Sequence, residues 1–472
     1  MPGDNVDDIG VNDLDLVIER TGHTRFRQLV VDRPEYVAVV ADLARVFRGM
    51  PAPPKPPGEV RGDGVAPAVV LRSYVSSWIG YGQAGEWVGR ELEAKGLPVG
   101  YWTYALSTDD ANNPPFVTNR VVSKAREGVP IVQMAVPQSP VTTGRTIVYT
   151  MWETTRLKPN QVEQLNRAAA VVVPCVWNAR CFAESGVTVP IHVVPLGVAS
   201  VEGYTPKPWQ GGPFTFGMAG RMAHGGARKG INEGMAAFVR AFDVREDVRL
   251  VVKVFPDCVA ALKVPNDHRI QVIAETWPQP KLAEWYGSIH CLLVPSKGEG
   301  FGLHTLQAMA CGRPVIAANV TGTAEFWTPA CGWELSGAWE PSGPSYGGIG
   351  DWFVPSEGSI IDALRAAYHG QDEARRKGEA AAARAAEFPW TRTGEGVRAV
   401  LAGLGWVGPV NGEARAKLHK AATVAKDRAI RCDHRSTIPC GCGMPWRCDL
   451  HGGKHAPTEV CQPCPDRTSL TE

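Results

Sequence analysis

The chain has 472 residues, enough for two or three domains, and its hydrophobic share of 44% is ordinary for a soluble protein. A formal net charge of +1 gives no overall attraction to nucleic acid or to an anionic membrane. No apolar run approaches the roughly 18 residues of a membrane-spanning helix, and the acidic N-terminus is unlike a signal peptide. We therefore expect a cytoplasmic protein without a transmembrane segment.

Residues 1–50 form a predicted helical leader, because apolar residues recur at helical spacing between Tyr36 and Phe47. The next segment, 51–65, is rich in proline and glycine. Proline lacks the N–H group that a helix interior or a sheet ladder needs, so this segment is expected to be a linker. It marks the first domain boundary.

Alternating patterns over residues 66–200 predict a doubly wound α/β domain. The expected strands are 68–75, 146–150, 170–173 and 191–194, with another beginning at Val99, and the later helices are 159–167 and 177–185. Gly80, Gly82 and Gly85 are expected at the turn after the first strand, where they either contact a ligand or only allow a tight turn. Their spacing is not that of a dinucleotide-binding loop, which argues against a nicotinamide site.

Polar side chains follow two of the expected strands in this domain. Glu153 follows strand 146–150, and Cys175, Trp177 and Asn178 follow strand 170–173. Ligands of doubly wound sheets bind beyond the carboxyl ends of the parallel strands. We therefore expect these four side chains to face a ligand-binding cleft.

Residues 212–405 repeat the alternation and predict a second doubly wound domain after an irregular connecting segment. The expected strands are 214–218, 250–255, 270–273, 290–294 and 315–318, and the helices are 231–242, 280–287, 303–311, 359–369 and 371–387. Arg221 and Lys229 follow the first of these strands. They are expected to face the cleft, although cations in a glycine-rich loop are often only solvated.

The stretch from Pro295 to Ile316 combines a glycine-rich turn with the start of a helix. The turn contains Glu299, Gly300 and Gly302, and the helix begins at Leu303. Unpaired N–H groups and the helix dipole point to one spot at such a junction, which makes it a candidate anion site. Gln307 lies eight positions after Glu299, inside the helix.

The spacing of Glu299 and Gln307 resembles the E-x7-E element of retaining, nucleotide-sugar-dependent glycosyltransferases with the GT-B fold. The resemblance covers about residues 68–400 and implies two Rossmann-like domains facing a cleft. It further implies that Arg221 and Lys229 bind the donor diphosphate with the N–H groups of Gly302 and Leu303. Gly300, Gly80 and Gly82 would line the donor site, Glu299 would lie by the sugar, and position 307 would bind ribose.

The implied activity is transfer of a sugar from a nucleoside-diphosphate sugar to an acceptor hydroxyl with retention of configuration. The body of the chain has no D-x-D element at a strand end to hold a catalytic metal, so fixed cations would stabilise the leaving diphosphate. The acceptor is a glycan, a protein, a small molecule or DNA.

Two departures from the family pattern leave another interpretation open. Gln307 replaces the second Glu, and a neutral side chain accepts weaker hydrogen bonds, so weaker donor binding is expected. The family's cleft histidine has no counterpart after strand 146–150, where Glu153 is the substitute catalytic candidate. A non-catalytic nucleotide-sugar-binding or scaffold protein is therefore the first alternative.

The C-terminal region has two segments of unusual composition. Residues 412–431 carry six Lys and Arg against two acidic residues, which predicts either a solvated linker helix or a polyanion contact. Residues 432–467 are rich in Cys and His and resemble the zinc-ribbon-like tails of some bacterial and phage glycosyltransferases, including the CPDR of Cys464 to Arg467. A DNA-modifying glycosyltransferase that binds DNA through both segments is the second alternative.

A segment as short as the tail has no hydrophobic core, so crosslinks must hold it together. In a cytosolic protein zinc is favoured over disulfides, and an iron–sulfur cluster is a further possibility. The predicted ligands are Cys432, His434, Cys440, Cys442, Cys448, His451, Cys461 and Cys464, with His455 beside them. The other six cysteines are spread through the body of the chain and are expected to be buried core residues.

Overall fold

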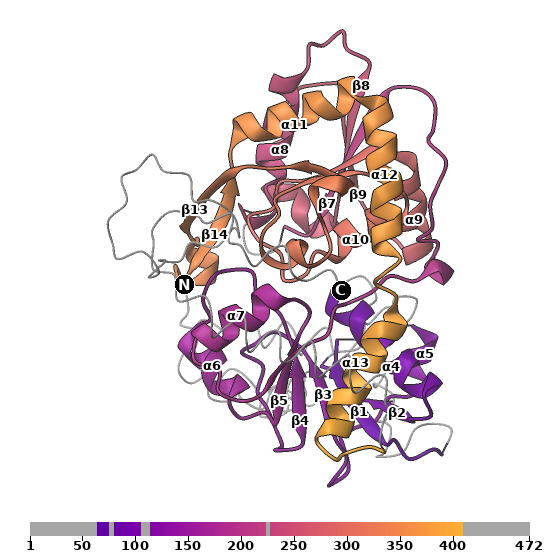
Figure 1. Ribbon diagram of the computed structural model, residues 1–472, viewed down its shortest axis with the longest axis vertical. Helices are drawn as coiled ribbons and strands as arrows, with labels where there is room; N and C mark the ends of the chain where they lie inside the picture. Colours follow the sequence, from indigo (N-terminus) through magenta and orange to yellow (C-terminus); the bar gives the residue numbers. More distant parts are fainter. Residues whose placement is uncertain (1–63, 75–79, 105–113, 223–226, 409–472) are drawn as a thin grey trace, which may run out of the picture. The chain divides into compact units, whose positions relative to one another are not determined.

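The computed structural model describes residues 64–74, 80–104, 114–222 and 227–408 (Figure 1). The expected helical leader, nearly all of the proline-rich linker, the basic segment 412–431 and the Cys/His-rich tail lie outside these ranges. None of the described helices is long and apolar enough to cross a membrane.

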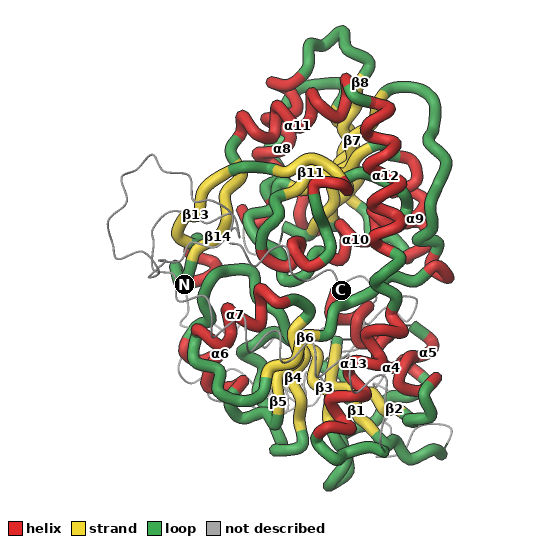
Figure 2. The backbone as a smooth tube through the Cα atoms, in the orientation of Figure 1, coloured by secondary structure: helices red, strands yellow, loops and turns green. Residues whose placement is uncertain are grey.

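The first sheet has six parallel strands in the order β2-β1-β3-β4-β5-β6 (Figure 2). They are β1 (Val69–Ser73), β2 (Val99–Tyr101), β3 (Ile131–Met134), β4 (Thr146–Tyr149), β5 (Ala170–Val173) and β6 (Ile191–Val193). The runs VVLRS, IVQM, TIVY and AVVV are almost wholly buried, as expected when helices cover both faces of a parallel sheet. The domain expected over 66–200 is thus built on a doubly wound sheet.

Four helices accompany this sheet: α4 (Gly80–Ala94), α5 (Pro115–Thr118), α6 (Pro159–Leu165) and α7 (Val176–Glu184). Gly80 is the first residue of α4, and Gly82 and Gly85 lie inside the helix, so their expected place in the preceding turn is wrong. A Cβ on Gly85 would come within 2.4 Å of Ser73 Oγ. At this position the missing side chain allows α4 to pack closely on β1.

The second sheet also has six parallel strands, in the order β12-β11-β10-β7-β8-β9. They are β7 (Phe214–Gly220), β8 (Val248–Val254), β9 (Ile270–Ala274), β10 (Cys291–Val294), β11 (Val315–Ala317) and β12 (Gly332–Glu334). Its helices are α8 (Ile231–Ala241), α9 (Gln279–Ser288), α10 (Leu303–Ala310), α11 (Glu357–His369) and α12 (Gln371–Ala385). The six cysteines expected in the core are all buried: Cys175, Cys181, Cys258, Cys291, Cys311 and Cys331.

The last described helix, α13 (Trp390–Gly403), returns to the first sheet and packs on α4 (Figure 1). The rings of Trp87 and Trp390 stack with centroids 6.2 Å apart. The expected second domain, 212–405, therefore includes a helix that packs with the first. Burial of Trp390, Val397 and Leu401 in this packing is the physical reason.

An antiparallel hairpin, β13 (Gly337–Pro341) and β14 (Asp351–Pro355), extends from the second sheet region to the segment after β4. Thr155 N donates to Asp351 O over 2.9 Å, and Asp351 N donates to Thr155 Oγ1 over 2.8 Å. The ring of Tyr346, between the two strands, meets the ring of Trp152 edge-on with centroids 5.2 Å apart. The hairpin thereby connects the halves of the chain next to Glu153.

Candidate functional site

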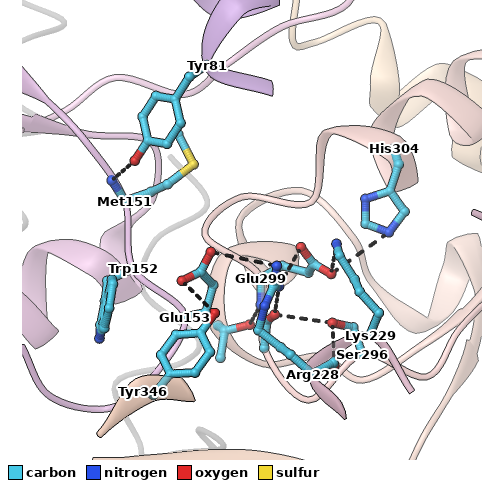
Figure 3. A network of polar contacts seen from close by, with 12 residues as sticks. Tyr81, Met151, Trp152, Glu153, Arg228, Lys229, Ser296, Glu299, His304 and Tyr346 are labelled. Atoms are coloured by element: carbon cyan, nitrogen blue, oxygen red, sulfur yellow. Dashed lines mark hydrogen bonds and ion pairs between the residues drawn. The ribbon is translucent and has the colours of Figure 1, made fainter. Parts of the chain in front are cut away.

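The polar cluster at the N-terminal end of α10 is centred on Glu299, which is only 6% exposed. Lys229 Nζ lies 2.7 Å from Glu299 Oε1, and Arg228 Nη1 lies 3.3 Å from Oε2. Both cations come from the short 3-10 turn η6 (Ala227–Lys229) after β7, and Figure 3 shows their side chains directed at the carboxylate. Arg228 also donates to the carbonyl of Gly298. The turn after β7 thus pairs with the turn after β10.

The charges of this cluster follow from burial and from neighbours. Burial raises the pKa of Glu299, but Lys229 and Arg228 outweigh it and hold that pKa well below its usual range. Burial lowers the pKa of Lys229, and the nearby Glu299 carboxylate opposes this shift. His304 lies with Nε2 4.0 Å from Glu299 Oε1, and burial followed by the charge of Lys229 lowers its pKa to about 4. At neutral pH the cluster therefore contains an ionised carboxylate and a neutral imidazole.

The conformation of the Glu299 turn is held by Thr321, the only non-glycine residue with positive φ (57°) in the described part of the chain. Glu299 N donates to Thr321 Oγ1 over 3.1 Å, and Gly322 N donates to Glu299 O over 2.8 Å. A left-handed conformation at a β-branched residue costs roughly 1–3 kcal/mol and persists only where the surroundings enforce it. The fold stores strain beside the candidate catalytic carboxylate.

Glu153 approaches the same cluster from the end of β4. Its Oε1 lies 3.9 Å from Arg228 Nη2, and its Oε2 accepts a hydrogen bond of 3.3 Å from the Tyr346 hydroxyl (Figure 3). The contact is close because Gly298 has no side chain: a Cβ there would lie 2.3 Å from Glu153 O. Gly300 is similarly pressed against Met151. The predicted candidates Glu153, Lys229 and Glu299 are therefore neighbours.

Gln307 lies deeper along α10 and is 4% exposed. Its Nε2 donates to Gln83 Oε1 over 3.2 Å and to Gln279 Oε1 over 3.4 Å. Gly302, with φ of 93°, is the N-cap of the helix, so Leu303 is the first helical residue, as predicted. The same short helix therefore presents charged neighbours at its start and amide neighbours in its interior.

Residues 213–332 match the model of the family described as "Glycosyl transferases group 1". A D-inositol 3-phosphate glycosyltransferase of Paenarthrobacter aurescens (strain TC1) is 33% identical over 141 residues, which are 29% of this chain and 29% of that protein. A D-inositol 3-phosphate glycosyltransferase of Thermobispora bispora is 44% identical over 66 residues, 14% of this chain and 15% of its own length. The matches thus span less than a third of these relatives.

The solved structures that resemble the fold include the following two. A sucrose-phosphate synthase from Thermosynechococcus elongatus has a TM-score of 0.53 at 16% identity, covering 71% of this chain and 98% of that one. WaaG, a glycosyltransferase involved in lipopolysaccharide biosynthesis, has a TM-score of 0.52 at 14% identity, covering 71% and 100%. The fold is GT-B. Two Rossmann-like domains and a final helix that packs with the first one form this chain's version of it.

The two cations that the family resemblance assigns to the donor diphosphate, Arg221 and Lys229, have different surroundings. The Arg221 guanidinium pairs with Asp257 over 2.7 Å and lies 5.6 Å from the centroid of the Phe255 ring, with about half of the side chain exposed. Arg228 lies beside Glu299 together with Lys229. Sequence reasoning did not select Arg228, although it is adjacent to Lys229 in the sequence; the diphosphate role of Arg221 stays a prediction.

Other expected cleft residues have structural contacts. Asn178 is fully buried and accepts a hydrogen bond of 2.8 Å from Trp152 N. Cys175 is the N-cap of α7, and its thiol donates to Gly300 O over 3.6 Å. Sequence reasoning missed His304 and Tyr346 as neighbours of the cluster, because their proximity to it depends on a turn and a hairpin.

Within residues 64–74, 80–104, 114–222 and 227–408, no group of three or more His, Cys, Asp or Glu side chains is arranged to hold a metal ion. The predicted zinc ligands lie outside these ranges.

Proposed function

We propose that the protein is a glycosyltransferase that moves a sugar from a nucleoside-diphosphate sugar to an acceptor hydroxyl with retention. The observation that supports this most directly is the convergence of Arg228 and Lys229 on Glu299 at the start of α10. All three residues lie within the segment that matches "Glycosyl transferases group 1". The acceptor would be a glycan, a protein or a small molecule.

The cations would bind the donor diphosphate. Arg228 offers a planar fork for two phosphate oxygens, Lys229 offers a point charge, and the N–H groups at the start of α10 add a favourable dipole. Without a ligand, Glu299 holds both cations. A diphosphate would compete for them and release the carboxylate toward the sugar hydroxyls.

The transfer itself breaks the anomeric C–O bond, and its electron pair leaves with the diphosphate. The acceptor oxygen forms the new bond on the same face of the sugar, and its proton passes to an oxygen of the departing phosphate. Arg228 and Lys229 would stabilise the charge that develops on the diphosphate. Glu153, which contacts Arg228, is the candidate for orienting the acceptor hydroxyl.

The test is an assay of the full chain against a panel of UDP-, GDP- and ADP-sugars, with sugar release and nucleoside-diphosphate formation followed by chromatography. We expect slow hydrolysis of one donor class without an acceptor, and faster consumption when the acceptor is supplied. The absence of both turnover and nucleoside-diphosphate binding across the panel would refute the proposal. The configuration of the product at the anomeric carbon tests retention.

The proposal also includes a structural zinc site in residues 432–467 and a cytoplasmic location, on the sequence grounds given above. Metal analysis of the purified full chain before and after chelation tests the zinc site. We expect one or two zinc ions per chain, and a metal-free tail whose cysteines form disulfides would contradict it.

A further inference from the structure

A continuous line of hydrogen bonds connects α4, the turn η4 (Ser200–Glu202), α9 and α10. Trp87 Nε1 donates to Glu202 Oε1 over 3.0 Å, and Gln83 Nε2 donates to Glu202 Oε2 over 3.2 Å. Gln83 Oε1 then accepts from Gln307 Nε2 over 3.2 Å. We call Trp87, Glu202, Gln83 and Gln307 the carboxylate–amide relay.

The directions of these hydrogen bonds follow from chemistry. An indole N–H only donates and an ionised carboxylate only accepts, so Glu202 must be met by N–H groups. The Gln83 amide therefore turns its nitrogen to Glu202 and its oxygen to position 307. Only a hydrogen-bond donor at position 307 satisfies that oxygen.

A second side-chain carbonyl oxygen, that of Gln279, also accepts a hydrogen bond from Gln307. Gln279 Oε1 accepts from the Tyr204 hydroxyl and also from Gln307 Nε2, over 3.4 Å for the latter bond. Both N–H groups of the Gln307 amide are thus used. A carboxylate at 307 would face two carbonyl oxygens in a largely buried place, and such unpaired acceptors are costly.

The remaining atom of the amide is Gln307 Oε1. No group in the described part of the chain donates to it, and it still reaches solvent. The relay therefore leaves one oriented acceptor, at the side-chain position where the family resemblance implies contact with ribose.

We propose that Glu202 is a positioning residue for the nucleotide subsite: through Gln83 it fixes the Gln307 amide so that Oε1 accepts a ribose hydroxyl of the donor. This inference depends on the proposed function for its ligand, but the relay itself does not. A carboxylate is therefore linked to position 307 through the side-chain amide of Gln83. It belongs to Glu202, in the segment that connects the two domains. The sequence alone predicts weaker donor binding with Gln307, and the relay gives a defined role to its amide; the Gln307→Glu variant tests both.

The experiment compares Glu202→Gln, Gln307→Glu and the double variant in the full chain. In the double variant the new carboxylate at 307 accepts from the Gln83 nitrogen, and the new amide at 202 donates to the Gln83 oxygen. We expect each single variant to bind UDP, GDP or ADP, whichever the unmodified protein prefers, about tenfold more weakly by calorimetry. The double variant should recover to within about threefold. Glu86→Gln is the matched control for the affinity comparison, because Glu86 lies on α4 with Gln83 and Trp87 but pairs with Arg90 over 2.7 Å.

Two further readouts separate orientation of the amide from general damage. Removing the ribose hydroxyl that Gln307 contacts, with a 2′-deoxy or 3′-deoxy nucleoside diphosphate, should abolish the difference between the unmodified protein and Glu202→Gln. Burial raises the pKa of Glu202 to about 7, with Glu86 adding to the shift and the Trp87 and Gln83 hydrogen bonds and Arg90 opposing it. Binding should therefore weaken as pH falls from 8 to 6 in the unmodified protein and not in Glu202→Gln.

The outcomes distinguish the two proposals. Additive losses in the double variant, both in affinity and in the unfolding temperature without ligand, would overturn the relay. If the unmodified protein binds none of the three nucleoside diphosphates, the ribose role and the proposed function both fail. In that case, recovery of the unfolding temperature in the double variant would still support the relay, and additivity would overturn it.

Discussion

The start and the interior of α10 face different kinds of polar neighbours. At its start, Glu299 is paired with Arg228 and Lys229, so full charges compensate each other in a buried place. One turn further, Gln307 is held by neutral amides, and the nearest charge of its network is at Glu202. Along α10, full charges lie at the start of the helix, where the proposed diphosphate would bind. The neighbouring region relies on the direction of hydrogen bonds instead.

The largest expected effect is a difference in turnover between substitutions of the two candidate arginines, Arg228 and Arg221. Arg228→Ala should lower turnover about 100-fold or more, because it removes the cation that we propose stabilises the leaving diphosphate. Arg221→Ala, which removes only an exposed pair with Asp257, is the control and should stay within about threefold. Initial rates with the preferred donor measure both. Equal losses in the two variants would return the diphosphate role to Arg221.

Glu299→Gln is expected to destabilise the ligand-free protein by about 3 kcal/mol, since it leaves buried cations without their carboxylate. Neighbouring cations hold the pKa of Glu299 below its usual range, so its contribution is present at neutral pH and is lost as pH falls through the acid range. Urea unfolding at pH 7 and at pH 4 measures the difference, which should shrink at the lower pH. Glu357→Gln removes an exposed pair with Arg240 and should cost less than about 0.5 kcal/mol.

Glu202 should show the opposite pH dependence in the amide region. Its pKa is raised to about 7 in the folded protein, so the folded state holds this proton more tightly than the unfolded chain does. The contribution of Glu202 to the free energy of unfolding is fully present below the usual carboxyl pKa. It falls by about 1–3 kcal/mol as pH rises toward 7. In urea unfolding between pH 5 and 8, Glu202→Gln should lack this decline. An unchanged pH slope would refute the raised pKa.

The smallest expected effect concerns the contact between the hairpin and Glu153. Tyr346→Phe removes one hydrogen bond to Glu153 Oε2 while keeping the ring against Trp152. We expect a loss of about 1 kcal/mol or less, measured as about a threefold decrease in kcat/KM for the acceptor. Tyr368→Phe is the control: it removes a hydroxyl from a ring packed on Phe214 and Phe242, away from Glu153, and should leave kcat/KM unchanged.

The regular part of the fold was largely predictable from the sequence. Strands such as Ala170–Val173 and Cys291–Val294 are short apolar runs between polar helices, and that alternation alone indicates a doubly wound sheet. Strand Ile131–Met134 was missed although it lies inside the first sheet between β1 and β4. Its four residues stand among prolines and turns, where local pattern carries little information.

The site was only partly predictable. Glu299, Lys229 and Glu153, selected separately from the sequence, lie close together because strand ends in a doubly wound sheet gather at one edge. Their functional roles stay predictions. Arg228 was not selected from the sequence, because only the path of the chain after β7 decides that this side chain reaches Glu299 while that of Arg221 pairs with Asp257. His304 was missed because an isolated histidine in a helix shows no pattern.

The sequence by itself determined the alternation of strands and helices, the glycine turn before α10 and the replacement of a carboxylate by Gln307. Tertiary structure decided that α13 returns to α4, that Arg228 reaches Glu299, and that Glu202 stands behind Gln307. The physical reason is the separation along the chain over which each kind of interaction acts. Periodicity and turn chemistry act over a few neighbouring residues, whereas Gln307 and Gln83 are 224 positions apart and meet only when both domains have folded.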